Sequence, residues 1–196
     1  MGVFPMININ NAVQFQHLLW DRIMKQAKIV VDATCGNGHD LLYLVERAKP
    51  NCHVYGIDIQ ERAIQASQSL LEQKKIDSNI TITFLHNSHD KAFAEDIQEN
   101  SIDLIIFNLG YLPGGNHTIV TKPYNTMQAL QLAMPKLVKD GVITIVAYPG
   151  TLEGYEEMKQ LEYYLSSLNQ KLYNVCHWKP INHVNNPPQL YIIQKR

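Results

Sequence analysis

The sequence predicts an α/β protein of the doubly wound class, with a mostly parallel seven-stranded sheet in which the last strand is antiparallel. Two observations indicate this fold. Short apolar runs rich in β-branched residues alternate with segments of helical periodicity as far as residue 168. Two further apolar runs then follow with only a short Pro-rich link between them. Parallel strands need a crossover helix, whereas strands joined by a short link pair antiparallel.

Each element follows from its own segment. The apolar runs predict strands at 28–34, 52–59, 79–86, 101–108, 141–150, 171–178 and 189–196. Helical spacing of apolar residues predicts helices at 13–24, 40–48, 61–75, 127–137 and 155–168. We expect a single domain over residues 1–196, of which 1–27 form an N-terminal helical extension.

The composition is that of an ordinary globular protein, with 45% hydrophobic residues, 18% charged residues and a formal net charge of −1. This excludes a strongly basic nucleic-acid coat, so RNA contact would need a local patch. Cys35, Cys52 and Cys176 form no Cys-x-x-Cys pair, which favours reduced thiols and no metal site. Without a basic leader or a long apolar segment, the sequence predicts a cytoplasmic protein that does not contact membranes.

The first strand-to-helix turn points to an adenosine-containing cofactor. Ligands of doubly wound sheets bind at the carboxyl ends of the strands. Gly36 and Gly38 follow the first strand there, where a backbone without side chains lets a ligand approach. Asp58 ends the second strand about 20 residues later, where a carboxylate can accept both hydroxyls of a ribose. Leu41 stands where the dinucleotide fingerprint has a small residue, which disfavours NAD.

The segment VVDATCGNGHD, residues 30–40, resembles motif I of the Rossmann-like class I S-adenosylmethionine-dependent methyltransferases. This resemblance implies S-adenosyl-L-methionine as cofactor, with Asn87, Ser88 and His89 beside its adenine and Asp90 as a further candidate. Capping of a helix is an equally good explanation for Ser88 and Asp90. The predicted cofactor-binding residues are Asp32, Gly36, Asn37, Gly38, Asp40, Asp58, Ile59, Asn87, Ser88, His89 and Asn108.

The segment NLGY, residues 108–111, follows the fourth strand and resembles the Asn-Pro-Pro-Tyr motif of amino-methyltransferases without its prolines. A side-chain carbonyl and the next backbone carbonyl can accept N–H bonds from an amine and aim its lone pair at a methyl group. A tyrosine can cover a planar base. We therefore predict catalytic roles for Asn108, Leu109 and Tyr111. The alternative is that Asn108 bonds a neighbouring backbone group, as asparagine does in turns.

Four segments in one order, VVDATCGNGHD, NLGYLPGGNHTIVT, YPG and NNPP, are similar to the MnmM (YtqB) family of methyltransferases, formerly described as rRNA methylases. The resemblance spans nearly the whole chain. It implies methylation of the amine of 5-aminomethyl-(2-thio)uridine at the tRNA wobble position. The predicted substrate-binding residues are Tyr111, Gly114, His117, Tyr148, Asn185 and Asn186. Residues 148–154 lack the His-containing, glycine-rich stretch usual in the family, which leaves a different acceptor open.

The expected partner is the anticodon stem-loop of tRNA, and a homodimer would suit so short a chain. Candidate phosphate contacts are Lys91, Lys122 and Lys179, and candidate proton acceptors are His39, His117 and His183. Two alternatives stay open at this point. One is a methyltransferase that acts on rRNA or on a small-molecule amine. The other is a protein that binds S-adenosylmethionine without catalysis.

Overall fold

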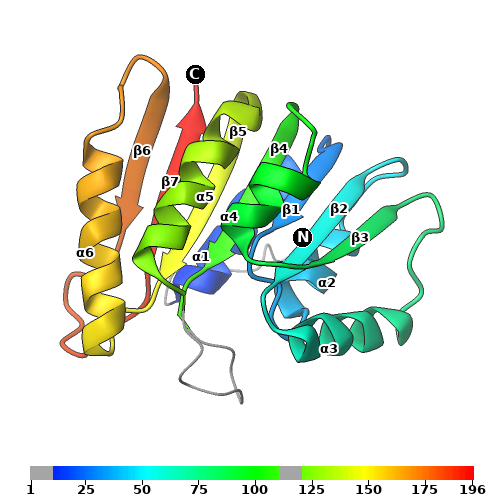
Figure 1. The fold of residues 1–196 in the computed structure, drawn as a ribbon, viewed down its shortest axis with the longest axis horizontal. Coiled ribbons are helices and arrows are strands. Elements are labelled where there is room, and N and C mark those ends of the chain that lie inside the picture. The colour runs from blue at the N-terminus through cyan, green and yellow to red at the C-terminus, as the bar shows by residue number, and fades with distance from the viewer. Residues whose placement is uncertain (1–10, 111–120) are drawn as a thin grey trace, which may run out of the picture.

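The computed structural model describes residues 11–110 and 121–196, and these form one seven-stranded sheet. Its strands are β1 (Ile29–Asp32), β2 (His53–Asp58), β3 (Thr81–His86), β4 (Ile102–Asn108), β5 (Leu137–Ala147), β6 (Tyr173–Trp178) and β7 (Gln189–Lys195). They lie in the order β3-β2-β1-β4-β5-β7-β6. β7 runs antiparallel to both β5 and β6, and every other neighbouring pair is parallel, as Figure 1 shows. The predicted fold class is confirmed.

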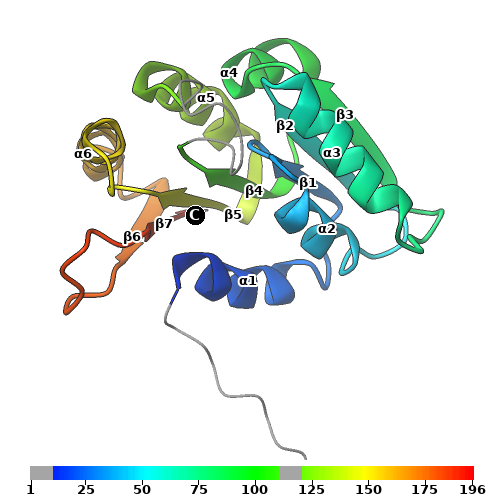
Figure 2. The same ribbon diagram turned by 90° about the horizontal axis from the view of Figure 1, so that it is seen from below.

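Helices cover both faces of the sheet. They are α1 (Ala12–Ile23), α2 (His39–Val45), α3 (Glu61–Glu72), α4 (His89–Lys91), the π-helix η1 (Ala92–Asp96), α5 (Pro123–Lys136) and α6 (Leu152–Ser166). Figure 2 shows α1 and α2 on the opposite side from α5 and α6. The sequence did not predict α4 and η1, because residues 89–96 are too short to show helical periodicity. There the buried ring of Phe93 joins the core, so tertiary packing forms the turn.

The core consists of two apolar layers, one on each face of the sheet. In β4, Leu104 and Ile106 pack with α1, α2 and α3, whereas Ile105 and Phe107 pack with η1, α5 and α6. Successive strand residues point to opposite faces, and both faces are covered here. This double burial explains why the strand is a continuous apolar run rather than an alternating one.

Helix α1 packs along the sheet, across several strands. The Asn11 side chain caps its first turn by accepting a bond from Val13 N at 2.8 Å. Ala12, Gln16 and Trp20 follow at intervals of four and are buried on one stripe. The indole of Trp20 donates to Thr144 Oγ1 in β5 at 3.1 Å. Farther toward the N-terminus of α1, Phe15 stacks on Trp178 of β6, with ring centroids 5.3 Å apart. α1 thus reaches from the β6–β7 hairpin to α2.

Candidate functional site

The strand order reverses between β1 and β4, because the chain moves from β1 outward through β2 and β3 and then returns to the other side of β1. In doubly wound sheets the ligand crevice lies at this position, outside the carboxyl ends of the strands. Asp32 ends β1 and Asn108 ends β4, so both lie at the switch point. We call the side of the sheet at which the parallel strands end the carboxyl edge.

The carboxylate of Asp58 joins the end of β2 to the turn after β1. Its Oδ2 accepts a bond from Gly36 N at 3.0 Å, and its Oδ1 accepts one from Gln60 N at 2.9 Å. Burial raises the pKa of this carboxyl group above its ordinary value. Each oxygen has a second lone pair, so the carboxylate can still accept hydroxyl groups. Beside it, Ile59 presents a side chain that is 58% exposed.

Asp32 is a fully buried carboxyl group. Its Oδ1 accepts a bond from Thr34 N at 3.1 Å, while its Oδ2 has no partner among the residues that the structure describes. Burial raises the pKa of Asp32 well above its usual range, and the nearby carboxylates of Asp40 and Asp58 raise it further. An unmet acceptor among three acidic groups favours a positively charged ligand.

Two glycines are explained by packing between elements. Gly38 has a φ of +84°, and a Cβ on it would lie 2.8 Å from Ser67 Cα in α3. The close approach of α3 thus requires glycine at this position, before any ligand is considered. A Cβ on Gly56 in β2 would lie 2.8 Å from a methyl group of Leu41. The small residue that lets α2 approach the sheet is therefore on β2, which explains how Leu41 is accommodated.

Asn108 lies at the centre of a side-chain hydrogen-bond cluster. Its Nδ2 donates to Asp40 Oδ2 at 2.8 Å, and its Oδ1 accepts a bond from Gln16 Nε2 at 3.3 Å. Its backbone N–H donates to Thr34 Oγ1 at 2.7 Å. The other Asp40 oxygen lies 2.7 Å from His17 Nε2. The Asn108 side chain is thus bonded to two side chains from α1 and α2, rather than to the backbone group of a turn.

Aromatic and charged groups surround Asp40. The ring of His17 stacks on Tyr43 at 3.9 Å between centroids, and the guanidinium of Arg47 lies 3.4 Å from the centre of the Tyr43 ring. Tyr148, which follows β5, is 39% exposed. Burial raises its pKa to about 12, and the Asp40 carboxylate contributes in the same direction. Tyr148 is therefore a neutral hydrogen-bond donor at physiological pH.

The predicted adenine-side residues follow β3. Ser88 is the N-cap residue of α4, but its side chain makes no capping bond. Asn87 and Asp90 bond to side chains of η1 and α5, respectively. The His89 ring is buried edge-on against Phe107, with centroids 5.7 Å apart, and burial lowers its pKa to about 4. The structure thus places His89 in the core layer below the carboxyl edge.

A second cluster joins the two ends of the segment after β4. Gly110 N donates to Thr121 Oγ1 at 2.8 Å, and Thr121 N donates to the Gly110 carbonyl at 2.9 Å. Thr121 Oγ1 in turn donates to Glu157 Oε2 at 2.8 Å, and Thr126 Oγ1 donates to Glu157 Oε1 at 3.2 Å. Burial raises the pKa of Glu157, and the two hydroxyl donors oppose that rise. We call Gly110, Thr121, Thr126 and Glu157 the neck cluster.

Three predicted substrate-binding residues, Tyr111, Gly114 and His117, lie outside the described residues. Asn185 and Asn186 lie in the exposed loop between β6 and β7, where Asn186 has a φ of +43°. Ile181 and Val184 of the same loop are each 90% exposed. This loop follows β6 at the carboxyl edge and presents apolar side chains to solvent.

Sequence reasoning missed several residues of these clusters: Gln16, His17, Thr34, Thr121 and Glu157. One signal was available for Gln16. It occupies the middle of the buried stripe Ala12, Gln16 and Trp20, where an apolar residue is expected. The bond between His17 and Asp40 joins two helices that are separate in sequence, so no local pattern indicates it.

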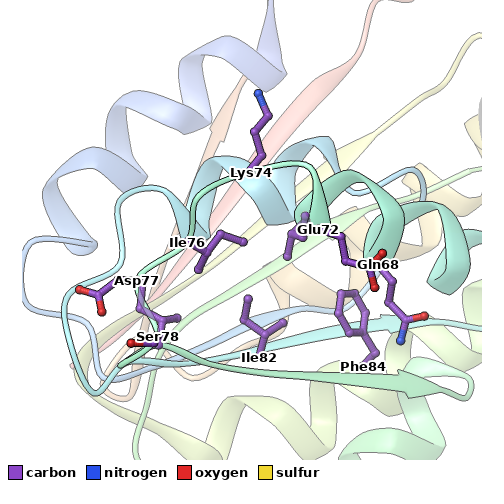
Figure 3. Close-up of a pocket in the computed structure, with 10 residues that line it drawn as sticks. Gln68, Glu72, Lys74, Ile76, Asp77, Ser78, Ile82 and Phe84 are labelled. Carbon is purple, nitrogen blue, oxygen red and sulfur yellow. The ribbon is translucent and has the colours of Figure 1, made fainter.

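A hollow of about 540 Å³ lies away from the carboxyl edge. The second half of α3, the turn after it and β3 line this hollow, and Figure 3 shows Ile76, Ile82 and Phe84 facing it while Lys74 points away. None of the predicted site residues in the described ranges is among its lining. Within those ranges no three His, Cys, Asp or Glu side chains are placed so that they could hold a metal ion, and no helix is long and apolar enough to cross a membrane.

Comparison with known proteins supplies the family. A family model described as "Putative rRNA methylase" matches residues 54–194. The chain belongs to this family. It is 33% identical over 190 residues to the chloroplastic tRNA (mnm(5)s(2)U34)-methyltransferase of Arabidopsis thaliana, a match that covers 94% of the chain and 69% of the relative.

Two solved structures agree with this assignment. A "putative rRNA-methylase" from Clostridium thermocellum is 36% identical, with a TM-score of 0.89 and coverage of 96% of this chain and 100% of that one. A Streptococcus mutans protein in complex with SAH is 30% identical, with a TM-score of 0.83 and the same coverage. The family predicted from the motifs is confirmed, and the chain is an S-adenosylmethionine-dependent methyltransferase.

Proposed function

We propose that this methyltransferase modifies the amine of 5-aminomethyl-(2-thio)uridine at the wobble position of tRNA. The observation that supports this most directly is the Arabidopsis relative, whose name specifies methylation at U34 and which matches 94% of the chain. The bonded amide of Asn108 at the end of β4 gives the same proposal a chemical basis, because it suits an acceptor that presents N–H groups.

The residues at the carboxyl edge fit S-adenosylmethionine. When bound, the cofactor supplies a methyl group on a sulfonium, which is a good leaving group. It bears positive charge on the sulfonium and on its amino group. The carboxylates of Asp40 and Asp58 offer complementary negative charge, and a bound cation would favour ionisation of the buried, partly unpartnered Asp32. We assign the ribose hydroxyls to Asp58 and the adenine to the surface formed by Ile59 and Asn87.

We assign the orientation of the acceptor amine to Asn108 Oδ1 and the Leu109 carbonyl. Both accept hydrogen bonds and neither donates at those atoms, so together they would hold two N–H groups and leave the nitrogen lone pair free. An alkylamine is mostly protonated at neutral pH and must lose a proton before it reacts. A neighbouring positive charge lowers the pKa of such an amine and favours this loss.

RNA contact would involve the exposed groups at the carboxyl edge. Lys91 in α4, Lys122 before α5 and Lys179 after β6 are all exposed and can meet phosphates. Ile181 and Val184, both 90% exposed, add an apolar surface of the kind that contacts a macromolecular partner. We expect binding of the anticodon stem-loop to weaken steeply with salt. A homodimer is part of the proposal, and sedimentation velocity tests it.

The decisive experiment presents labelled S-adenosylmethionine and the purified protein with three substrate classes: tRNA containing 5-aminomethyluridine, rRNA and simple alkylamines. We expect label only in the wobble nucleoside of tRNA, identified by nucleoside mass spectrometry. Asn108→Ala is expected to lower kcat by about a hundredfold, whereas Asn79→Ala, which lies before β3 at the opposite edge, keeps it. Label in rRNA or an alkylamine, or in nothing, would overturn the tRNA assignment.

A further inference from the structure

The side-chain amide of asparagine has two ends of nearly the same shape but opposite hydrogen-bonding character. With its oxygen toward an amine, Asn108 accepts an N–H bond; with its NH₂ group there, it would repel the same donor. The function assigned to Asn108 therefore requires something that fixes the orientation of the amide. Asp40 provides this, because a carboxylate only accepts and its Oδ2 lies 2.8 Å from Asn108 Nδ2.

Asp40 is itself held by α1. His17 Nε2 lies 2.7 Å from Asp40 Oδ1, and the two side chains are 22% and 15% exposed, so water competes little for this bond. The His17 ring is fixed by neighbouring aromatic rings, with Tyr43 at 3.9 Å and Trp20 at 4.7 Å between centroids. The imidazole thus has a defined position from which it holds one oxygen of Asp40 and leaves the other for Asn108.

Gln16 supports the same amide from its other end. Its Nε2 donates to Asn108 Oδ1 at 3.3 Å, a bond that agrees with the amide orientation set by Asp40. Gln16 is fully buried, and its Oε1 has no partner in the part of the chain that the structure describes. Burying an unmet acceptor destabilises a protein, whereas an apolar residue would complete the buried stripe of α1. The bond to Asn108 is the gain that accounts for an amide there.

We propose that α1 is part of the acceptor site and that Gln16, His17 and Asp40 are positioning residues that keep Asn108 Oδ1 toward the substrate amine. The inference rests on the proposed function, since the orientation matters only if Asn108 receives an amine. It changes the expected role of Asp40 from a cofactor contact to the group that fixes Asn108. It also gives the N-terminal helix a role in specificity for nitrogen acceptors.

Two substitutions at position 17 separate positioning from packing. His17→Phe keeps a ring between Tyr43 and Trp20 but removes the bond to Asp40, whereas His17→Gln places an amide N–H near the same point. We expect His17→Phe to lower kcat by about ten- to a hundredfold, the loss of one oriented hydrogen bond to a charged group. KM for tRNA and the affinity for S-adenosylmethionine, measured by titration, should stay within about twofold. His17→Gln should recover most of kcat.

Equal kcat in His17→Phe and the wild type would overturn the proposal, as would a parallel loss of cofactor affinity. A second measurement does not depend on activity. In ¹⁵N-labelled protein the side-chain amide signals of Asn108 should shift in His17→Phe and in Gln16→Met, while those of Asn79 stay in place. Unshifted Asn108 signals would contradict the positioning role. If the wild type methylates no tRNA, the proposed function fails, and these amide signals still decide the positioning role.

Discussion

Thr121→Val removes the hydroxyl at the centre of the neck cluster and keeps the size of the side chain. In the wild type this hydroxyl accepts a bond from Gly110 N and donates one to the Glu157 carboxylate, both at 2.8 Å. A neutral hydrogen bond contributes about 1 kcal/mol and one to a charged group about 1.5–3 kcal/mol, so the free energy of unfolding should fall by about 2.5–4 kcal/mol. For a chain of this length the melting temperature should fall by roughly 5–15 °C.

The loss should also depend on pH. The pKa of Glu157 in the folded protein is raised above its ordinary value of 4.5 because the side chain is buried, and the Thr121 bond opposes that rise. Between pH 4.5 and the folded pKa of Glu157, the folded state therefore binds more protons than the unfolded state, so stability falls as the pH rises through this range. Without the Thr121 bond the folded pKa of Glu157 rises further, so the loss of stability continues to higher pH. The difference between variant and wild type should be larger at about pH 8 than at about pH 5.

Urea unfolding at the two pH values measures both effects, and Thr126→Val is the matched control. Thr126 also donates to Glu157, at 3.2 Å, but it makes no bond to Gly110. We expect Thr126→Val to lose about half as much stability and to keep more of the methyltransferase activity, because the bond between Gly110 and Thr121 persists. A loss below about 0.5 kcal/mol for Thr121→Val, or equal behaviour of the two variants, would refute this account.

Three further outcomes follow from single contacts. Gly38→Ala should lower the free energy of unfolding by about 2–4 kcal/mol, because the new Cβ would lie 2.8 Å from the α3 backbone and φ at this position is +84°. Gly150→Ala is the control: its Cβ would meet nothing within 4 Å, so the free energy of unfolding should change by under about 0.5 kcal/mol. Burial lowers the pKa of His89 from 6.5 to about 4, so between these two pH values the unfolded state binds more protons than the folded state. The free energy of unfolding of the wild type should therefore fall by about 3 kcal/mol as the pH drops from 6.5 to about 4. Urea titrations of His89→Gln at the same pH values should not show this pH-dependent loss of stability. Asp32→Asn should stabilise the protein at neutral pH by about 1–2 kcal/mol and weaken S-adenosylmethionine binding about tenfold; unchanged cofactor affinity would exclude Asp32 from the cofactor site.

The strands could be predicted because the residues that determine each strand lie within its own segment of the sequence. β4 is buried on both faces, so Leu104 to Phe107 form an uninterrupted apolar run, and the turn after β1 is marked by glycines. The clusters around Asn108 and Glu157 could not be predicted in the same way. Asn108 meets Gln16 and Asp40 only because α1 and α2 pack on one face of the sheet, and this proximity leaves no trace in local spacing.

The sequence motifs also predict cofactor contacts for two residues, Gly38 and His89, that are constrained by packing against other parts of the protein. Gly38 was predicted as a cofactor contact, and it is required by the approach of Ser67 in any case. His89 was predicted beside the adenine, and its ring is buried against Phe107. In both cases the neighbour that constrains the residue comes from a different segment of the chain.

The course of α1 along the sheet has a consequence for the order in which the protein matures during synthesis. Phe15 stacks on Trp178, and Ala12 packs with Val146 and Leu190, so α1 packs against strands that are synthesised after it. We expect α1, which carries Gln16 and His17, to become fully packed once β6 and β7 have left the ribosome. If α1 positions Asn108 as proposed, a chain truncated before β6 should hold Asn108 less firmly and transfer methyl groups more slowly.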